Sequence, residues 1–472
     1  MAQPRFYNTL GRKRAPFEPR VPREVRIYTC GPTVYDRCHI GNFRTFVFED
    51  LLRRSLRFLG YEVTQVMNLT DVDDKTIQGA REAGVPLDRF TAPFVEAFFE
   101  DLDTLGIERA EHYPRATEHI PEMIQLIEHL VEEGCAYEND GSVFFRIAAD
   151  DDYGRLSGID LSQVRRGERV ASDDYGKEDV RDFVLWKGAK PGEPSWESPW
   201  GKGRPGWHIE CSAMAMKYLG ESFDIHCGGV DNVFPHHENE IAQSESATGK
   251  EFVRTWLHAE HLLVDGAKMS KSLGNFYTLV DLLERGIDPR AVRYLFLSTH
   301  YRKKLNFTFA ALEDAAAALR RLDEVSFRLE HAREAPGGES PIPAVVEKLE
   351  TDFAQALTDD LNTSEALAAL FVFVRQVNVA IEEGALAEGD RQRVLEALGR
   401  VDTVLGVLDP GPWRREDGHE AISEEEVERL IAERQQARKA RDFARADKIR
   451  DRLAEQGIVV EDSPQGQRWK RR

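Results

Sequence analysis

The feature that most constrains the fold is a strand–helix–strand pattern near the N-terminus. Residues 23–30 (REVRIYTC) alternate enough to predict a strand, residues 43–59 have helical periodicity, and residues 62–68 (EVTQVMN) predict a second strand. A helix that joins two strands in this way places them in a parallel sheet. The same rhythm of helix and strand resumes at residues 207–219 and 223–227. We therefore predict an α/β domain.

Changes in composition divide the rest of the chain. Residues 137–206 are rich in Gly, Asp, Arg and Trp and are predicted to form an insertion in the α/β domain. The turn-rich stretches APGGESPIP (335–343) and LDPGPW (408–413) bracket an Ala/Leu-rich helical piece, and a basic helical pair follows. The predicted units are residues 1–136 and 207–255 (the two halves of the α/β domain), 137–206 (the insertion), 256–330 (a following region), 345–408 (a helical bundle) and 420–472 (a C-terminal region).

Composition excludes a disordered chain, because 41% of the 472 residues are hydrophobic and 31% are charged. The formal net charge of −20 argues against a polyanionic partner for the body of the protein. Residues 434–472, however, hold twelve lysines or arginines and only six aspartates or glutamates. The tail therefore differs in sign from the body. It suits a phosphate-rich partner, and the alternative, which its charge alone favours, is an ordinary solvated helical pair.

The five cysteines do not make a disulfide framework in so long a chain. The N-terminus lacks the basic segment and apolar core of a signal peptide. The longest apolar run, residues 366–374, has about half the length of a membrane span. We expect a cytoplasmic protein with no membrane partner.

The stretch TCGPTVYDRCHIGN (29–42) raises the question of what its cysteines do. Cys30 and Cys38 are too far apart for a zinc knuckle or a redox CxxC pair. A single cysteine is most often a small buried side chain, and we expect this of Cys38, Cys135 and Cys227.

A second clue lies in VFPHHENEIAQS. Asp231 or Asn232 is expected to cap a helix with Pro235 in its first turn, so that His236 and Glu240 lie one turn apart on the same face. The alternative for this pair is an ordinary solvated polar face. Together with Cys30 and Cys211 (in WHIECSAM), the pair would supply two thiolates, an imidazole and a carboxylate, which favour Zn²⁺ over Mg²⁺ or Ca²⁺.

Two further motifs suit a nucleotide. HIGN (39–42) lies where the first strand gives way to a long helix, and helix N-termini attract phosphate. AKMSKSLGN (267–275) places Lys268 and Lys271 in a loop bracketed by glycines, which can close over a triphosphate. The alternative for the second motif is a basic surface turn. Neither a P-loop nor a dinucleotide-binding GxGxxG is present in a βαβ context.

These motifs resemble a known family. HIGN and KMSKS resemble the paired signatures of class I aminoacyl-tRNA synthetases, and the longer phrases CGPTVYDRCHIGNFRTF, NLTDVDDK, GWHIECSAM and DIHCGGVDNVFPHHENEIAQS resemble cysteinyl-tRNA synthetases. The match continues to ARADKIRDRLAEQGIVVEDSPQGQRW near the C-terminus. The resemblance implies a class I Rossmann-type catalytic domain with an inserted subdomain, a KMSKS loop and stem-contact region at 256–330, a helical bundle, and anticodon recognition by residues 420–472.

The resemblance also assigns roles to individual residues. The fourth position of the family's HIGH signature is Asn42 here, which retains a donor but cannot ionise. The implied sites are one Zn²⁺ per chain on Cys30, Cys211, His236 and Glu240; a cysteine pocket that includes Gly31, Thr70, Trp207 and His226; nucleotide contacts from Gly41, Asp231 and Lys271; and catalytic groups His39, Asn42, Lys268 and Lys271.

The activity implied by the resemblance is activation of L-cysteine with ATP and Mg²⁺, followed by transfer to tRNA(Cys), with zinc selecting the substrate thiolate. We expect a monomer. Two alternatives stay open: a ligase that couples cysteine to glucosaminyl-inositol, which has no use for an anticodon-reading tail, and a non-catalytic tRNA-binding protein derived from a synthetase.

Overall fold

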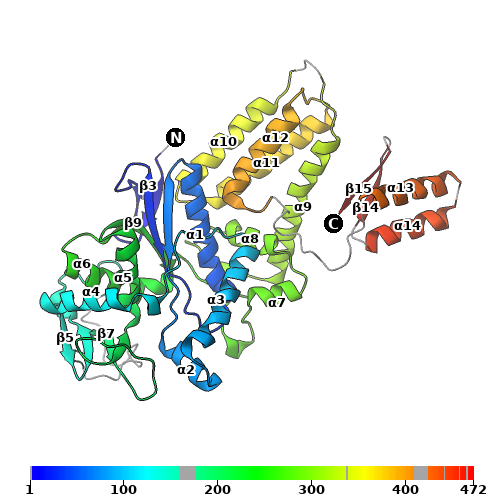
Figure 1. Cartoon of the computed structure of the whole chain (residues 1–472). Coiled ribbons are helices and arrows are strands. Elements are labelled where there is room, and N and C mark those ends of the chain that lie inside the picture. Colours follow the sequence, from blue (N-terminus) through cyan, green and yellow to red (C-terminus); the bar gives the residue numbers. More distant parts are fainter. Residues whose placement is uncertain are drawn as a thin grey trace.

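The centre of the molecule is a four-stranded parallel sheet, seen in a computed structural model that describes residues 3–159, 177, 179, 181–335, 339–408, 424–440, 442–455, 458–463 and 466–471 (Figure 1). The strand order is β10-β9-β3-β4, and every neighbouring pair is parallel. The predicted α/β domain is therefore confirmed. The strands are β3 (Glu24–Thr29), β4 (Glu62–Met67), β9 (Phe223–Gly229) and β10 (Val253–Ala259).

The sheet is buried on both faces because its strands carry apolar side chains on each face. Val25 and Ile27 of β3 belong to the core that contains the apolar face of α1 (Ile40–Phe58). Tyr28 and Val66 belong to a second core that contains α5 (Trp207–Leu219). Helix α6 (Glu238–Thr248) links β9 to β10. A parallel sheet covered in this way leaves its strand ends as the accessible edge.

The segment between β4 and the insertion is more divided than its sequence pattern predicts. Residues 94–134 have a helical pattern with an interruption near Tyr113 and Pro114, but α3 ends at Thr104 and α4 begins only at Ile120. Gly106 has positive φ and Pro114 has no N–H, so neither suits a helix interior. The elements here are α2 (Asp74–Ala83), α3 (Leu87–Thr104), η1 (Ala116–Glu118) and α4 (Ile120–Glu132).

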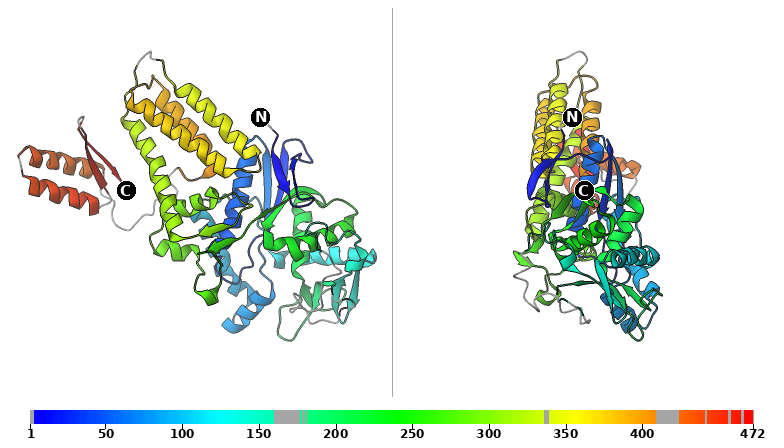
Figure 2. Two further views of the ribbon diagram at one scale, coloured as in Figure 1. Left: turned by 180° about the vertical axis from the view of Figure 1, so that it is seen from behind. Right: turned by 90° about the vertical axis from the view of Figure 1, so that its left-hand side faces the viewer.

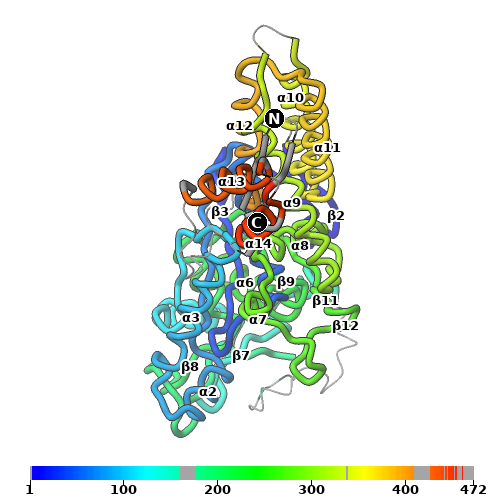
Figure 3. The backbone as a smooth tube through the Cα atoms, turned by 90° about the vertical axis from the view of Figure 1, so that its right-hand side faces the viewer, coloured from blue at the N-terminus to red at the C-terminus, as the bar shows by residue number. Residues whose placement is uncertain are grey.

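An antiparallel sheet of order β5-β6-β7-β8 occupies the lower end of the view in Figure 3, within the predicted insertion. Trp186 is buried at its centre. Residues 160–176, 178 and 180 of the insertion lie outside the described residues. The elements are β5 (Ala136–Asn139), β6 (Ser142–Phe145), η2 (Ile147–Ala149), β7 (Phe183–Gly188) and β8 (Gly203–Pro205).

A helical bundle stands at the opposite end (Figures 1 and 2). Among the described residues, α11 alone has the length and apolar composition of a membrane span. Its buried residues, such as Leu370 and Val377, belong to the main core, which identifies it as a bundle helix. The elements from β10 onward are β11 (Leu262–Val264), β12 (Ala267–Lys268), η6 (Lys271–Leu273), α7 (Leu279–Glu284), α8 (Pro289–Ser298), β13 (Leu305–Phe307), α9 (Phe309–His331), α10 (Ile342–Thr358), α11 (Thr363–Glu382) and α12 (Asp390–Leu405).

Both chain ends contain hairpins that the sequence analysis did not anticipate. At the C-terminus the expected helical pair is present, but an antiparallel strand pair follows it. The boundary stretch 408–413 lies outside the described residues after Leu408, as do residues 336–338 of the earlier one. The terminal elements are β1 (Arg5–Asn8), β2 (Lys13–Pro16), α13 (Glu424–Lys439), α14 (Phe443–Glu455), β14 (Ile458–Ser463) and β15 (Gly466–Arg471).

Candidate active site and metal centre

The site residues expected from the sequence gather at the carboxyl ends of the parallel strands. Cys30 and Gly31 follow β3, Thr70 follows β4, and Asp231 follows β9. From β3 the chain crosses through α1 to β4 on one side, whereas β9 lies on its other side. In open α/β sheets, ligands bind at such a switch point.

Cys30, Cys211, His236 and Glu240 lie together although they come from three separate segments. One ligand atom from each lies within 4.8 Å of the others, and all four residues are buried. Cys30 directly follows β3, Cys211 is on α5, and Glu240 is in the first turn of α6. The structure thus brings the complete predicted ligand set to one point.

The helix that carries Glu240 begins later than the sequence indicated. Asp231 and Asn232 do not cap it, because α6 begins at Glu238 and Phe234 has an extended backbone (φ −139°, ψ 130°). The proline that follows Phe234 disfavours the helical conformation of the residue before it. The intervening turns are η4 (Val230–Asn232) and η5 (Val233–His237).

The donor set fits a zinc ion. Glu240 Oε1 is buried without a hydrogen bond, although His236 Nε2 lies 3.1 Å away, so both atoms point toward the same position. Burial raises the pKa of the Cys30 and Cys211 thiols and of the Glu240 carboxyl. A divalent cation would reverse this preference, because it binds thiolates, carboxylates and neutral imidazoles. A buried orphan acceptor beside two thiols is explained by such an ion.

A second group of four overlaps the first. Cys30, His226, His237 and Glu240 also bring ligand atoms within 4.8 Å of one another. The first set fits zinc better because it has two sulfur ligands. His237 is not among the residues predicted from the sequence, although the HH pair in PHHENE is a visible signal for it. Five of the thirteen histidines lie in or beside the cluster: His208, His226, His236, His237 and His258.

Three of the expected cysteine-pocket residues surround the cluster. The Trp207 ring stacks on His236 with centroids 4.1 Å apart and remains 40% exposed, so it borders solvent. Thr70 donates its hydroxyl proton to Glu210 Oε2 at 3.0 Å. His226 lies 3.0 Å from Glu240 Oε2. Glu210, buried beside Thr70, was not anticipated and had no sequence signal apart from its place in WHIECSAM.

Gly31 and Gly41 stand where a side chain would not fit. A Cβ on Gly31 would lie 1.8 Å from the Asn68 carbonyl oxygen. A Cβ on Gly41 would lie 2.9 Å from the His39 ring and 3.1 Å from the Met269 methyl. Both positions therefore allow close approach of neighbouring groups, as a nucleotide or substrate site requires.

His39 and Asn42 form a capping box at the start of α1. The Asn42 N–H donates to His39 Nδ1, and the His39 N–H donates to Asn42 Oδ1, both at 3.1 Å. Burial lowers the pKa of His39, so the ring is neutral at neutral pH. Because Nδ1 accepts a hydrogen bond, the ring proton lies on Nε2.

The KMSKS loop packs against this helix start. The Ile40 N–H donates to the Tyr277 carbonyl at 2.9 Å, which docks the segment after the loop beside His39. Lys271 Nζ forms an ion pair with Asp36 Oδ2 at 2.5 Å, whereas Lys268 is exposed at the loop entry. Asp231 is also exposed, and its charge acts on His39. The two predicted nucleotide motifs are thus neighbours.

Comparisons with known proteins agree with this arrangement. Residues 16–317 match a model of the catalytic domain of class I tRNA synthetases of the cysteine type, residues 352–409 a DALR domain, and residues 423–469 a cysteinyl-tRNA ligase anticodon-binding domain. Among curated relatives, the chain is 53% identical to a cysteine–tRNA ligase of Chlamydia pneumoniae, over 98% of each chain. It is 51% identical to a cysteine–tRNA ligase of Solibacter usitatus, over 99% of each.

Solved structures show the same fold at low identity. A Mycobacterium tuberculosis methionyl-tRNA synthetase in complex with methionyl-adenylate superposes with a TM-score of 0.58 at 17% identity, covering 84% of this chain and 92% of that one. An Agrobacterium radiobacter leucyl-tRNA synthetase gives 0.56 at 12% identity, covering 85% and 88%. With relatives this similar over their full length, the chain belongs to the cysteine–tRNA ligase family of class I aminoacyl-tRNA synthetases.

Proposed function

We propose that this chain activates L-cysteine with ATP and transfers the cysteinyl group to the terminal ribose of tRNA(Cys). The observation that carries the proposal is the position of a buried Cys/His/Glu cluster beside two adjoining phosphate-binding motifs, at the switch point of one sheet. In the first step the cysteine carboxylate attacks the α-phosphorus of MgATP, and pyrophosphate leaves. In the second, a ribose hydroxyl attacks the adenylate carbonyl, and AMP leaves.

His39 binds a phosphate oxygen as a neutral donor. Its Nδ1 is occupied by the Asn42 N–H, so Nε2–H is the group that can donate. The dipole of α1 favours negative charge at the same end of the helix, although the Ile40 and Asn42 N–H groups are already bonded, to the Tyr277 carbonyl and to His39 Nδ1. Asn42 acts through His39, because its side-chain oxygen is used in the capping box.

Lys271 neutralises the charge that develops on the leaving pyrophosphate. Its partner in the structure is Asp36, on the loop between β3 and α1. To reach the phosphates it must leave this partner. Lys268, at the entry of the same loop, adds a second positive charge.

Selection of cysteine follows from the metal centre. We assign one Zn²⁺ to Cys30, Cys211, His236 and Glu240; when bound, it supplies attraction for a thiolate that the hydroxyl of serine does not match. Trp207 and Thr70 border the space beside the cluster and would hold the substrate's backbone against the strand ends. A site that makes such a specific contact can reject the analogue lacking it by about 10⁴-fold without editing.

The C-terminal region supports tRNA over the amino-sugar acceptor. The matched anticodon-binding region has no role in coupling cysteine to glucosaminyl-inositol. The family matches over residues 352–409 and 423–469 support our proposal of separate units at 345–408 and 420–472. We also propose that the protein is a cytoplasmic monomer. Size-exclusion chromatography with light scattering tests the oligomeric state.

The test is cysteine-dependent ATP–pyrophosphate exchange, measured with cysteine and with serine, before and after chelation. We expect exchange with cysteine only, loss on chelation, recovery with Zn²⁺, and charging of tRNA(Cys). Absence of exchange by zinc-loaded protein would favour the non-catalytic alternative. Exchange without charging of tRNA, together with coupling to glucosaminyl-inositol, would favour the amino-sugar ligase.

A further inference from the structure

Three arginines bind backbone carbonyls at the end of the last bundle helix, α12. Arg54 belongs to α1, and Arg290 and Arg293 belong to α8. We call these three residues the carbonyl clamp. Its contacts are Arg54 Nη1 with the Thr403 oxygen (3.2 Å), Arg293 Nε with the Leu405 oxygen (2.7 Å) and Arg290 Nε with the Val407 oxygen (2.9 Å).

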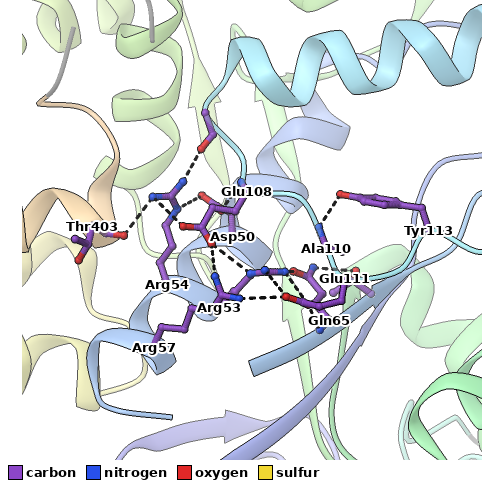
Figure 4. Close-up of polar contacts among 12 residues, drawn as sticks. Asp50, Arg53, Arg54, Arg57, Gln65, Glu108, Ala110, Glu111, Tyr113 and Thr403 are labelled. Carbon is purple, nitrogen blue, oxygen red and sulfur yellow. Dashed lines mark hydrogen bonds and ion pairs between the residues drawn. The ribbon is translucent and has the colours of Figure 1, made fainter. Parts of the chain in front are cut away.

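A buried carboxylate joins two of these arginines. Asp50 Oδ2 accepts from Arg293 Nη2 at 2.5 Å and from Arg54 Nε at 2.8 Å, and Asp50 Oδ1 accepts from the Glu108 N–H at 3.0 Å. Figure 4 shows Asp50, Arg54, Glu108 and Thr403 in this network. The side chains of Asp50 and Arg293 are fully buried. Breaking a buried, paired charge is costly, so this geometry is held firmly.

The end of α12 is closed by its own residues and by the clamp together. Gly406 takes the left-handed conformation, and its N–H donates to the Asp402 carbonyl at 2.8 Å. Asp402 Oδ1 then accepts the N–H groups of Val407 and Leu408 at 2.7 and 2.8 Å. The carbonyls in the last turn of a helix have no partner within the helix. The clamp supplies donors to two of them from other elements, so the end of α12 depends on α1 and α8.

The clamp connects three functional parts of the chain. Helix α1 begins at the capping box of His39, and α8 follows the KMSKS loop after only one short helix. Among the described residues, helix α12 is the last element before the region matched to anticodon binding, residues 423–469. The end of α12 is thus fixed to α1, which begins at the HIGN motif, and to α8, which follows the KMSKS loop after α7.

We propose that the carbonyl clamp positions the anticodon-binding region relative to the adenylation site, so that a tRNA bound at its anticodon presents its acceptor end correctly. This rests on the proposed function. The three arginines are positioning residues, since none contacts the cluster or the KMSKS loop in the described part of the chain. Their effect requires an RNA that reaches both regions.

The test compares Arg54→Ala with Arg57→Ala in the full-length, zinc-loaded chain. Arg57 lies on the same helix and binds Glu108 and Glu111 at 2.8 and 3.2 Å, but makes no contact with α12 among the described residues (Figure 4). Three reactions are measured: cysteine-dependent pyrophosphate exchange, charging of a hairpin RNA carrying only the acceptor stem, and charging of full-length tRNA(Cys).

For Arg54→Ala we expect kcat/KM to fall by about 5- to 150-fold with full-length tRNA, the usual range of coupling between sites, with exchange and hairpin charging unchanged. Arg57→Ala should leave all three reactions unchanged. An equal loss in every reaction, or no loss with full-length tRNA, would overturn the inference. If Arg54→Ala does not fold, Arg290→Gln, which removes the Val407 contact, decides by the same criteria. A parent protein without exchange activity refutes the proposed function itself.

Discussion

The ion pair between Lys271 and Asp36 predicts how ATP binding responds to one substitution. Asp36→Asn removes a carboxylate that competes with the ATP phosphates for Lys271. The Nζ–Oδ2 distance is 2.5 Å, but the two side chains are 68% and 39% exposed. Pairs this exposed contribute about 0.2–1 kcal/mol. Converted by the thermal energy, this corresponds to a Kd for ATP that is lower by about 1.4- to 5-fold.

The assay is calorimetric titration with MgATP in the absence of cysteine, together with exchange kinetics. We expect the gain to disappear near 1 M salt, where the Debye length falls to about 3 Å, and the KM for cysteine to stay constant. Glu100→Gln is the matched control. It also removes one carboxylate that pairs with this loop, because Glu100 lies 3.5 Å from Arg37, but the ion pair of Lys271 is with Asp36 and not with Glu100. An unchanged or higher Kd for Asp36→Asn, or the same decrease in Glu100→Gln, would refute the competition.

Three further predictions concern the surroundings of the same site. Asn42→Ala removes the acceptor for the His39 N–H and should cost about 1 kcal/mol at the helix start, seen as an exchange rate about fivefold lower; Asn42→Asp keeps that oxygen and should instead raise the KM for ATP, and equal effects of both would contradict the capping role. Burial raises the pKa of Asp101 from 3.8 to about 6, so its charging destabilises the fold as pH rises through that range; Asp101→Asn should gain at most about 2 kcal/mol in urea unfolding at pH 8, after allowance for the lost pair with Arg37, and close to nothing near pH 3. Cys211→Ser should lower the affinity for zinc by more than the roughly 10- to 100-fold loss that is typical when a residue hydrogen-bonded to a metal ligand is replaced. If mass spectrometry finds the same zinc content in the variant and the parent, Cys211 is not a ligand.

Local sequence patterns predicted the central strands and helices, because their periodic apolar residues are visible within one segment. The strand at 23–30 and the helix at 207–219 correspond to β3 and α5 within one or two residues. The C-terminal hairpin was missed because its strands, β14 and β15, follow a basic amphipathic pair and have little apolar alternation of their own. The predicted start of α6 was wrong because Pro235 disfavours the helical conformation of Phe234. The prediction considered only which residues could cap the helix.

The candidate site was predictable as a set of residue types, but its convergence was not. The i, i+4 spacing of His236 and Glu240 is visible in the sequence, whereas their meeting with Cys30 depends on the sheet order. Asp36 was passed over because an exposed aspartate in a loop has no pattern. Its role depends on which loop packs opposite it, and that loop begins more than two hundred residues later.

The overlapping second group of ligands follows from packing rather than from spacing. His237 is adjacent to His236, yet its Nδ1 lies 2.8 Å from His258 Nε2 on β10, and its Nε2 lies 3.3 Å from Cys30 Sγ. These contacts join residues 21 and 207 positions apart, so only the neighbouring β10, β9 and β3 bring them together. His237 therefore contacts the Cys30 sulfur directly, and His258 on β10 positions the His237 ring. The same sulfur also contacts Cys211. The histidines outside the proposed ligand set, His226, His237 and His258, are thus buried packing partners of the proposed metal centre.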